Sequence, residues 1–320
     1  MTKLDRYLDA ATRDNTRTSY ASAIRHFEID WGGFLPATAD SVARYLADNA
    51  ETLSTNTLRQ RLAALAQWHV DQGFPDPTKT PVVRKTFRGI RALHPAQEKQ
   101  AKPLQLDQLG VATRWLEVSV AEARAACDRE AELRHTRNKA LLLLGFWRGF
   151  RGDELTRLRV EHVTAVPGTG MTCYFPRTKG DRAYKGTEFK APALSRLCPV
   201  EAYLEWTEAA RLTSGPVFRA IDRWGHVSES GLHIDSLLPI LRRILADAGI
   251  TGADLYSGHS LRRGFANWAT SNGWDLKTLM EYVGWKNVQS AMRYVEAADP
   301  FAKQRIESSL LIAAEKGADI

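Results

Sequence analysis

GHSLRRG, residues 258–264, begins a stretch with helical character and places a histidine and an arginine three residues apart. Side chains at positions i and i+3 of a helix lie on one face, so His259 and Arg262 can reach the same small group. An imidazole beside a guanidinium suits an anion such as phosphate. Taken alone, the pair has a simpler interpretation, in which His259 packs in a core while Arg262 and Arg263 are solvated. The rest of the chain decides between the two.

The second half of the chain combines helices with a small sheet. Residues 138–149 (NKALLLLGFWRG) predict a buried helix, residues 152–158 predict another after a tight turn, and residues 170–194 predict two or more strands joined by basic turns. Further helices, several ending at glycine, are expected at 198–212, 234–249, 260–273, 275–284 and 288–298. The predicted fold class is mostly α with a small antiparallel β-sheet, an α+β protein.

The first part of the chain, residues 3–75, predicts a small bundle of helices. Its clearest helix, residues 55–73, ends at a glycine and carries apolar side chains close to the 3.6-residue period: Leu58, Leu62, Leu65, Trp68 and Val70. Three prolines follow between residues 75 and 81, and a short basic helix is expected at 82–91. Residues 94–104 (HPAQEKQAKPL) are polar and rich in proline, so they are the expected linker to a second domain.

Composition narrows the class of protein. The chain has 320 residues, enough for two domains, and its 44 Lys and Arg against 37 Asp and Glu favour a polyanionic partner. The longest apolar run, residues 141–147, is too short to cross a membrane, and the charged N-terminus lacks the apolar core of a signal peptide. Three scattered cysteines and no metal-ligand spacing predict reduced thiols and no structural metal. We therefore expect a cytoplasmic protein with no membrane partner.

Phosphate chemistry without a metal needs cations, a nucleophile and a proton donor, and the second half of the chain supplies candidates for each. Arg151 lies in GFRGDEL between two predicted helices, and Glu154 can orient it, although Arg148 is a rival on spacing alone. The other candidates are Lys179 in a strand turn with the alternatives Lys185 and Lys190, the indole donor Trp285, and the phenol Tyr294. Taken singly, most of them have an ordinary structural interpretation. Their shared order and spacing indicate a site.

That order and spacing resemble the tyrosine recombinase (phage integrase) family over about residues 105–300. Five elements carry the resemblance: an arginine in GFRGDEL, a lysine on the following β-turn (RTKG), H-x-x-R at a helix start (GHSLRRG), a Gly-Trp pair (VGWKN), and a tyrosine nine residues after that tryptophan. Most of the family has histidine at the position of Trp285. Tryptophan there, together with SGHS and GW-x-N, resembles the Cre-like subgroup of the family.

The resemblance implies a role for each position in cleaving DNA. Tyr294 would attack a phosphate and form a 3′-phosphotyrosyl link. Arg151 and Arg262 would hold the non-bridging oxygens, and Lys179 would protonate the departing 5′ oxygen. The implied activity is site-specific recombination through Holliday-junction intermediates.

Three further residues would support this chemistry. By resemblance, His259 would hydrogen-bond the phosphate or take the tyrosine proton, Trp285 would donate to the phosphate, and Glu154 would support the site. A covalent link stores the energy of the phosphodiester, so the exchange is nearly isoenergetic. No ATP, metal or other cofactor is therefore expected, in line with the missing P-loop motif.

The resemblance also implies a domain plan. We expect a helical core DNA-binding domain at 1–93, the linker at 94–104, a catalytic domain at 105–298 and a tail helix at 299–320. The two domains would enclose a double-stranded DNA recombination site. Candidate phosphate contacts in the first domain are Arg17, Arg59, Arg61, Arg84, Lys85, Arg88 and Arg91.

The tail carries apolar residues that could line one helical face: Ile306, Leu310, Leu311 and Ala314. In the family such a tail commonly packs into a neighbouring subunit, which implies a homotetramer in the synaptic complex, acting at the bacterial nucleoid. The alternative is that the tail packs against its own domain.

Three other functions are open alternatives. A DNA-binding relative without catalysis would be expected to have lost at least one of the six candidate catalytic residues. A strand-relaxing enzyme resembling type IB topoisomerases would not require a specific paired site. A metal-dependent transposase would need a triad of carboxylates, and Asp153, Glu154 and Asp181 show no such setting.

Overall fold

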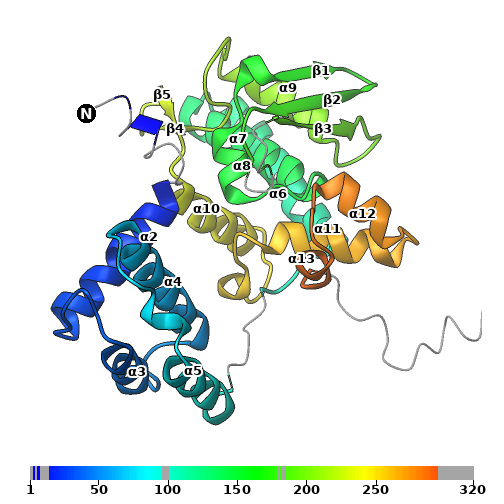
Figure 1. The fold of residues 1–320 in the computed structure, drawn as a ribbon. Helices are drawn as coiled ribbons and strands as arrows, with labels where there is room; N and C mark the ends of the chain where they lie inside the picture. Colours follow the sequence, from blue (N-terminus) through cyan, green and yellow to red (C-terminus); the bar gives the residue numbers. More distant parts are fainter. Residues whose placement is uncertain are drawn as a thin grey trace, which may run out of the picture. The chain divides into compact units, whose positions relative to one another are not determined.

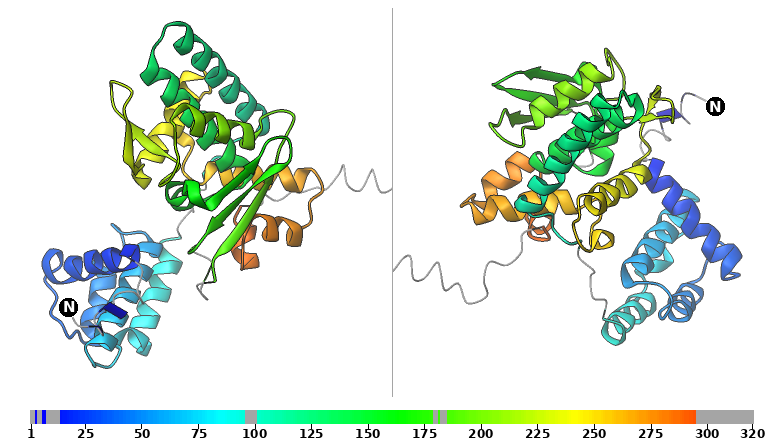
Figure 2. Two further views of the ribbon diagram at one scale, coloured as in Figure 1. Left: turned by 90° about the horizontal axis from the view of Figure 1, so that it is seen from above. Right: turned by 180° about the vertical axis from the view of Figure 1, so that it is seen from behind.

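The computed structural model describes residues 3, 6–7, 14–95, 101–178, 181 and 185–294. Lys179 and the expected tail helix, residues 299–320, lie outside the described residues. The chain divides into two compact units, Met1–Lys99 and Gln100–Ile320, and each has a hydrophobic core of its own (Figure 1, Figure 2).

All the regular secondary structure in the described part of the first unit is helical. Its elements are α2 (Asp14–Arg25), the π-helical turn η1 (His26–Asp30), α3 (Ala39–Asp48), α4 (Thr55–Asp71), the 3-10 turn η2 (Pro77–Lys79) and α5 (Pro81–Leu93). A side-chain cap begins α4, because Ser54 Oγ accepts the Thr57 N–H at 3.1 Å. Proline begins α5, where the missing N–H breaks no helical bond. The predicted bundle and basic helix are confirmed.

One residue of the apolar pattern predicted for α4 does not face the core. Val70 is 57% exposed, whereas the neighbouring His69 is buried. His69 Nε2 accepts the backbone N–H of Ala37 at 2.8 Å, and His69 Nδ1 lies 2.7 Å from the carbonyl oxygen of Leu65. Hydrophobic periodicity missed this histidine because its burial depends on polar partners, one of them distant in sequence.

The second unit is built mainly from helices, together with two small antiparallel sheets. Its helical elements are α6 (Leu106–Ala125), α7 (Arg129–Trp147), α8 (Gly152–Arg157), η3 (Val160–His162), α9 (Pro199–Ala209), α10 (Ile234–Asp247), η4 (Ala253–Leu255), α11 (Ser260–Ser271), α12 (Leu276–Val283) and α13 (Val288–Met292). The sequence analysis did not predict α6, and α7 begins well before the predicted residue 138. Asp128 accounts for that earlier start, since its carboxylate accepts the Ala131 N–H at 3.0 Å.

The larger sheet has the strand order β1-β2-β3, formed by β1 (Val163–Val166), β2 (Gly170–Phe175) and β3 (Thr187–Pro192). Both pairings are antiparallel, and Cys173 of β2 lies opposite Val163 on one side and Phe189 on the other. A separate hairpin joins β4 (Arg219–Ile221) to β5 (Val227–Gly231) and was not predicted. The predicted fold class, mostly α with small antiparallel sheets, is confirmed.

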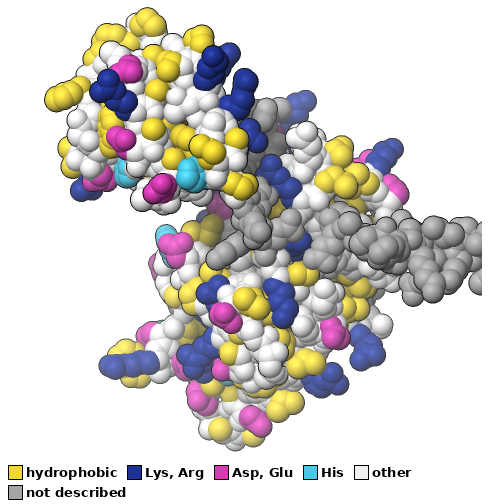
Figure 3. All heavy atoms as spheres, turned by 90° about the horizontal axis from the view of Figure 1, so that it is seen from below, with side chains coloured by type: hydrophobic (Ala, Val, Ile, Leu, Met, Phe, Trp, Pro, Cys, Tyr) yellow, Lys and Arg dark blue, Asp and Glu magenta, His cyan; other side chains and the backbone are white. Residues whose placement is uncertain are grey.

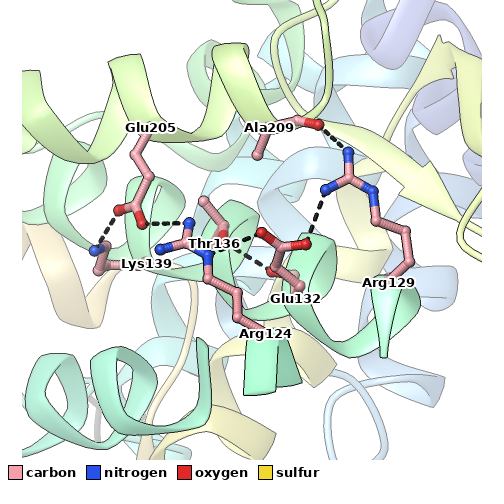
Figure 4. Close-up of polar contacts among 7 residues, drawn as sticks. All are labelled: Arg124, Arg129, Glu132, Thr136, Lys139, Glu205 and Ala209. Atoms are coloured by element: carbon pink, nitrogen blue, oxygen red, sulfur yellow. Dashed lines mark hydrogen bonds and ion pairs between the residues drawn. The ribbon is translucent and has the colours of Figure 1, made fainter. Parts of the chain in front are cut away.

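Helix α7 lies at the centre of the second unit, with α6, α9 and α11 packed against it. Ion pairs join three of these helices (Figure 4). Glu132 of α7 accepts from Arg124 Nε of α6 at 2.9 Å, and Glu205 of α9 accepts from Arg124 Nη2 at 3.0 Å. Lys139 of α7 pairs with the other oxygen of Glu205 at 2.5 Å. The network holds α6, α7 and α9 together.

A close backbone approach fixes the position of α11. A Cβ atom added to Gly264 would lie 2.0 Å from the carbonyl oxygen of Leu104, so only glycine fits at this contact. The Leu104 N–H also donates to the Ser260 carbonyl at 3.1 Å. The first turn of α11, which carries the residues of GHSLRRG, is thereby held against the segment that leads into α6.

Candidate active site

Arg262 occupies the centre of the site and is fully buried in the first turn of α11. Its Nη1 donates to the carbonyl of Gly149 at 2.6 Å, and its Nη2 lies 3.5 Å from the carbonyl of Val283. Gly149 has φ +56°, a conformation that favours glycine. These bonds hold the guanidinium between the turn after α7 and the end of α12. The interpretation of Arg262 as a solvated surface residue is therefore wrong.

Glu154 connects the two predicted phosphate-binding arginines. It is 4% exposed at the start of α8, and its carboxylate accepts both the backbone N–H and the Nη1 of Arg151 at 2.7 Å. The same carboxylate lies 3.7 Å from Arg262 Nη1. A buried carboxylate between two guanidiniums holds both in place and offsets part of their mutual repulsion.

The electrostatics of this group favour an anionic guest. Burial lowers the pKa of the Arg262 guanidinium to about 10, and the positive charge of Arg151 acts in the same direction, while Glu154 raises it. Arg262 therefore stays charged at neutral pH. Two guanidiniums share one carboxylate here, so a net positive charge is left for a ligand.

Tyr294 and His259 form the other half of the site. The phenol oxygen of Tyr294 lies 3.0 Å from His259 Nδ1, which is hydrogen-bond distance. His259 is the residue before α11, and Tyr294 follows α13, so the contact joins elements distant in sequence. The Arg262 guanidinium carbon lies 5.7 Å from the centre of the Tyr294 ring. An imidazole nitrogen this close to a phenol can receive its proton.

Trp285 packs between these groups. Its ring stacks on Tyr294 with centres 5.2 Å apart and planes at 27°, and the Arg262 guanidinium carbon lies 4.9 Å from the indole centre. Gly284, with φ +75°, ends α12 and turns the chain so that the Trp285 N–H bonds back to the Met280 carbonyl at 2.8 Å. Among the described residues, Trp285 Nε1 is buried and has no acceptor. A buried indole N–H beside the Arg262 guanidinium is suited to an anionic oxygen.

Arg148, the rival of Arg151, has a different environment. It is 1% exposed and donates through Nη1 to the carbonyl of Lys190 at 3.0 Å and through Nη2 to the carbonyl of Tyr282. Its guanidinium carbon also lies 3.9 Å from the centre of the Tyr282 ring. Arg151 keeps 24% of its side chain exposed. Arg148 therefore binds the sheet to α12, and Arg151 is the arginine open to a ligand.

The structure brings five of the six predicted catalytic residues together: Arg151, His259, Arg262, Trp285 and Tyr294. The sixth, Lys179, lies outside the described residues, in the chain between β2 and β3. Its alternatives Lys185 and Lys190 are both exposed, the first between the same strands and the second on β3 itself.

The sequence analysis missed the role of Arg263, which follows Arg262 in the doubled arginine of GHSLRRG. Arg263 is 5% exposed, and its Nη1 donates to the carbonyl of Arg293 at 3.0 Å. The acceptor belongs to the residue directly before Tyr294. Side chains at adjacent helix positions point in different directions, so the doubled arginine indicated that Arg263 has a partner other than those of Arg262.

The candidate DNA contacts of the first unit lie on three helices. Arg84, Lys85, Arg88 and Arg91 are all exposed on α5. Arg59 of α4 is exposed and lies over the Phe87 ring of α5 at 5.9 Å. The remaining two are Arg17, paired with Asp14, and Arg61, whose Nη1 donates to the Ser22 carbonyl at 3.2 Å. Lys and Arg side chains, interspersed with acidic ones, are visible on one face of each unit (Figure 3).

No group of three or more His, Cys, Asp or Glu with the geometry of a metal site occurs among the described residues. The carboxylates considered for a transposase have other partners: Asp153 pairs with Arg157 at 2.9 Å, and Asp181 accepts the Gly186 N–H at 2.8 Å. None of the helices in the described ranges has the length and apolar character needed to span a membrane.

Comparison with protein families gives a match to the phage integrase family over residues 114–300, more than half of the chain. The chain belongs to the phage integrase family. The predicted family is thus confirmed, and the match covers the second unit, where the candidate site lies.

Two curated relatives resemble this phage integrase family member over most of its length. The integrase/recombinase xerD homolog of Selenomonas ruminantium is 29% identical over 309 residues, covering 93% of this chain and 86% of the relative. The recombinase cre of Escherichia phage P1 is 24% identical over 276 residues, covering 83% and 78% respectively.

Two solved structures of site-specific recombination proteins share the fold of this chain. A XerH site-specific recombinase bound to palindromic difH substrate aligns with a TM-score of 0.59 at 18% identity, over 93% of this chain and 79% of that one. A lambda integrase dimer bound to a COC′ core site aligns with a TM-score of 0.57 at 15% identity, over 93% of this chain and 95% of that one. At these identities the likeness supports the fold.

Proposed function

We propose that this chain is a site-specific tyrosine recombinase, which cleaves and rejoins DNA through a 3′-phosphotyrosyl intermediate and exchanges strands through a Holliday junction. One observation carries the proposal: the Tyr294 phenol lies 3.0 Å from His259 Nδ1, next to the buried Arg262 and Glu154 and the partly exposed Arg151. A nucleophile, a base and two phosphate-binding cations are all in one place. Family membership and the two curated relatives support the same activity.

The first chemical step follows from these positions. A bond forms between Tyr294 Oη and the scissile phosphorus, and the bond from phosphorus to O5′ breaks. His259 Nδ1 takes the phenol proton, in the tautomer that leaves this nitrogen unprotonated. The family resemblance assigns protonation of O5′ to Lys179. Religation is the same step in reverse, with a 5′ hydroxyl from the partner duplex as the nucleophile.

Charge stabilisation comes from donors already in place. Arg151 and Arg262 donate to the non-bridging oxygens, whose negative charge increases in the transition state, and Trp285 Nε1 supplies a third donor. Glu154 touches the two arginines, so it is a positioning residue. Because the phosphotyrosyl ester stores the energy of the broken bond, the reaction needs no ATP.

The two compact units suggest how DNA is held. We assign residues 1–93 to core DNA binding, 105–298 to catalysis and 94–104 to the linker between them. The exposed basic residues of α5 are the best candidates for phosphate contacts in the first unit: Arg84, Lys85, Arg88 and Arg91. Contacts of this kind position a duplex and weaken with salt.

We also propose a homotetramer in the synaptic complex, acting on DNA in the bacterial nucleoid. The family resemblance implies that the tail, with its apolar residues Ile306, Leu310, Leu311 and Ala314, docks on a neighbouring subunit. A groove of about 970 Å³, with Leu106 and Val111 of α6 and Leu143 of α7 among its lining, is a candidate acceptor. Truncation after residue 298 would then abolish tetramers on DNA while single-site binding persists.

Two experiments test the proposed activity. Wild type is incubated in EDTA with random-sequence duplexes, and the duplexes that it binds are sequenced to define the site. Wild type and Tyr294→Phe are then each tested on that site for DNA that stays attached to protein in SDS. Plasmids with none, one or two copies of that site are then treated with wild type. We expect covalent capture by wild type alone, and circle excision or inversion only with two copies.

The outcomes separate the alternatives. Relaxation of a plasmid without any site would favour a topoisomerase. Specific binding without covalent capture by wild type would favour a DNA-binding factor and contradict the proposal.

A further inference from the structure

The buried guanidinium of Arg263 is hydrogen-bonded to the backbone directly before Tyr294. Arg263 lies next to Arg262 in α11, but its guanidinium points to the end of α13, where Nη1 donates to the Arg293 carbonyl at 3.0 Å. Burying a guanidinium to 5% exposure costs several kcal/mol unless it is well bonded. The Arg293 side chain itself is exposed, so this residue faces the core only through its carbonyl.

The peptide group between Arg293 and Tyr294 is held from both sides. Its oxygen accepts from Arg263, and its nitrogen, the Tyr294 N–H, donates to the Ala291 carbonyl at 2.9 Å. Because a peptide group is planar, these two bonds fix its orientation. That orientation sets the direction in which the Tyr294 side chain leaves the backbone.

The element that carries Tyr294 needs such an anchor. α13 has five residues, Val288–Met292, and Ala291 is its one buried residue. A helix this short is unstable without tertiary contacts. α11, in contrast, is packed against α7, and its position is fixed where Gly264 meets Leu104. Arg263 therefore ties a weak element to a rigid one.

One helix, together with the residue before it, carries the base, one of the two phosphate-binding arginines and the residue that holds the nucleophile's backbone. His259 precedes α11, Arg262 lies in its first turn, and Arg263 follows directly. The 3.0 Å contact from Tyr294 Oη to His259 Nδ1 depends on the distance between α11 and the Arg293–Tyr294 peptide. Arg263 spans that distance.

We propose that Arg263 is a positioning residue for the Tyr294 nucleophile, which holds the Arg293–Tyr294 peptide against α11 so that the phenol meets its base and the phosphate. This inference rests on the proposed function. It predicts slow attack with unchanged DNA affinity, because a displacement of about 1 Å of a reacting atom costs on the order of 100-fold in rate.

The test measures covalent adduct formation in single turnover, on a nicked duplex of the selected site at saturating protein. Arg263→Met is expected to react about 30- to 100-fold more slowly than wild type. Its dissociation constant for DNA should stay within about threefold of the wild-type value, because sites that share no partners act nearly independently. Arg263→Lys keeps a charged donor and is expected to recover part of the rate. Arg263→Gln replaces the methionine variant if that protein does not bind DNA.

Arg137→Met is the matched control. Arg137 is also buried in the second unit, at 6% exposure, and donates to a backbone carbonyl, that of Arg219, at 3.0 Å. We expect it to lose thermal stability and keep the wild-type rate of attack. A similar slowing in Arg137→Met would mean that destabilisation alone explains the effect and would overturn the inference.

The remaining outcomes distinguish the inference from the function it rests on. If a folded Arg263→Met or Arg263→Gln attacks at the wild-type rate, the inference fails while the recombinase assignment stands. If wild type itself forms no adduct on a site that it binds, the proposed function fails first.

Discussion

Replacing Trp285 by phenylalanine should separate activity from stability. The phenyl ring keeps the stack on Tyr294 and the contact with Arg262, and the substitution removes the buried indole N–H that has no acceptor among the described residues. If this N–H serves the transition state, its loss should slow adduct formation by about 10²- to 10³-fold, the usual effect of deleting one such donor.

The stability change should be small because two effects oppose each other. An unpaired buried donor costs about 1–3 kcal/mol, and this cost disappears in the variant. The smaller ring leaves a space that costs a comparable amount, about 1–2 kcal/mol. The net change should stay within about 1 kcal/mol, or roughly 2–4 °C in melting temperature for a unit of this size.

Single-turnover adduct formation and thermal melting measure the two quantities. Trp206→Phe is the control, because Trp206 is fully buried and its Nε1 donates to the Val217 carbonyl at 2.8 Å, remote in sequence from the site. That variant should melt lower and keep its rate. A Trp285→Phe protein that reacts within threefold of wild type would refute the donor role. A loss of activity matched by a melting temperature below that of Trp206→Phe would assign Trp285 to packing.

Three other substitutions test the assignments around the site and its scaffold. Arg148→Met leaves the carbonyls of Lys190 and Tyr282 without their donor, so its free energy of unfolding should fall by about 3 kcal/mol, or roughly 6–12 °C in melting temperature. Arg151→Lys, in contrast, should melt near wild type and form adduct about 100-fold more slowly. The reverse pattern would exchange the roles of the two arginines. Arg124 lowers the pKa of the Glu132 carboxyl through a hydrogen bond, so Glu132 contributes stability above its usual pKa of 4.5 that is lost as the pH falls through the lower folded-state value. Glu132→Gln should therefore be less stable than wild type by about 1 kcal/mol at pH 7, with a narrower gap at a pH below 4.5. Urea denaturation at both pH values measures the gap, Glu229→Gln on β5 is the exposed control, and a gap independent of pH would contradict the assignment.

Most of the helices were predicted because their ends are marked locally in the sequence, although α6 was not. Caps and glycines mark the ends of the helices, as Ser54 and Gly284 do. The candidate site residues lie at or near helix ends and turns, so a short motif such as GHSLRRG contains more than one of them. The β4–β5 hairpin escaped prediction because β4 has three residues, too few for an alternating pattern, and its pairing is interrupted by a register shift.

Other features depend on contacts between distant segments. The choice between Arg148 and Arg151 depends on two carbonyls, of Lys190 and Tyr282, that only the folded chain brings to Arg148. Likewise the contact of Glu154 with Arg262 joins residues more than a hundred positions apart. Patterns within one segment carry no information on such partners.

The central claim is that Tyr294 itself becomes linked to DNA, and peptide mapping of the adduct tests it directly. Trypsin cleavage after Arg293 and Lys303 releases YVEAADPFAK, residues 294–303, in which Tyr294 is the sole hydroxyl-bearing side chain. After nuclease digestion, we expect the residual nucleotide mass on this peptide, attached through a 3′-phosphate. A nucleotide on any other peptide, or a 5′-linked one on this peptide, would contradict the account.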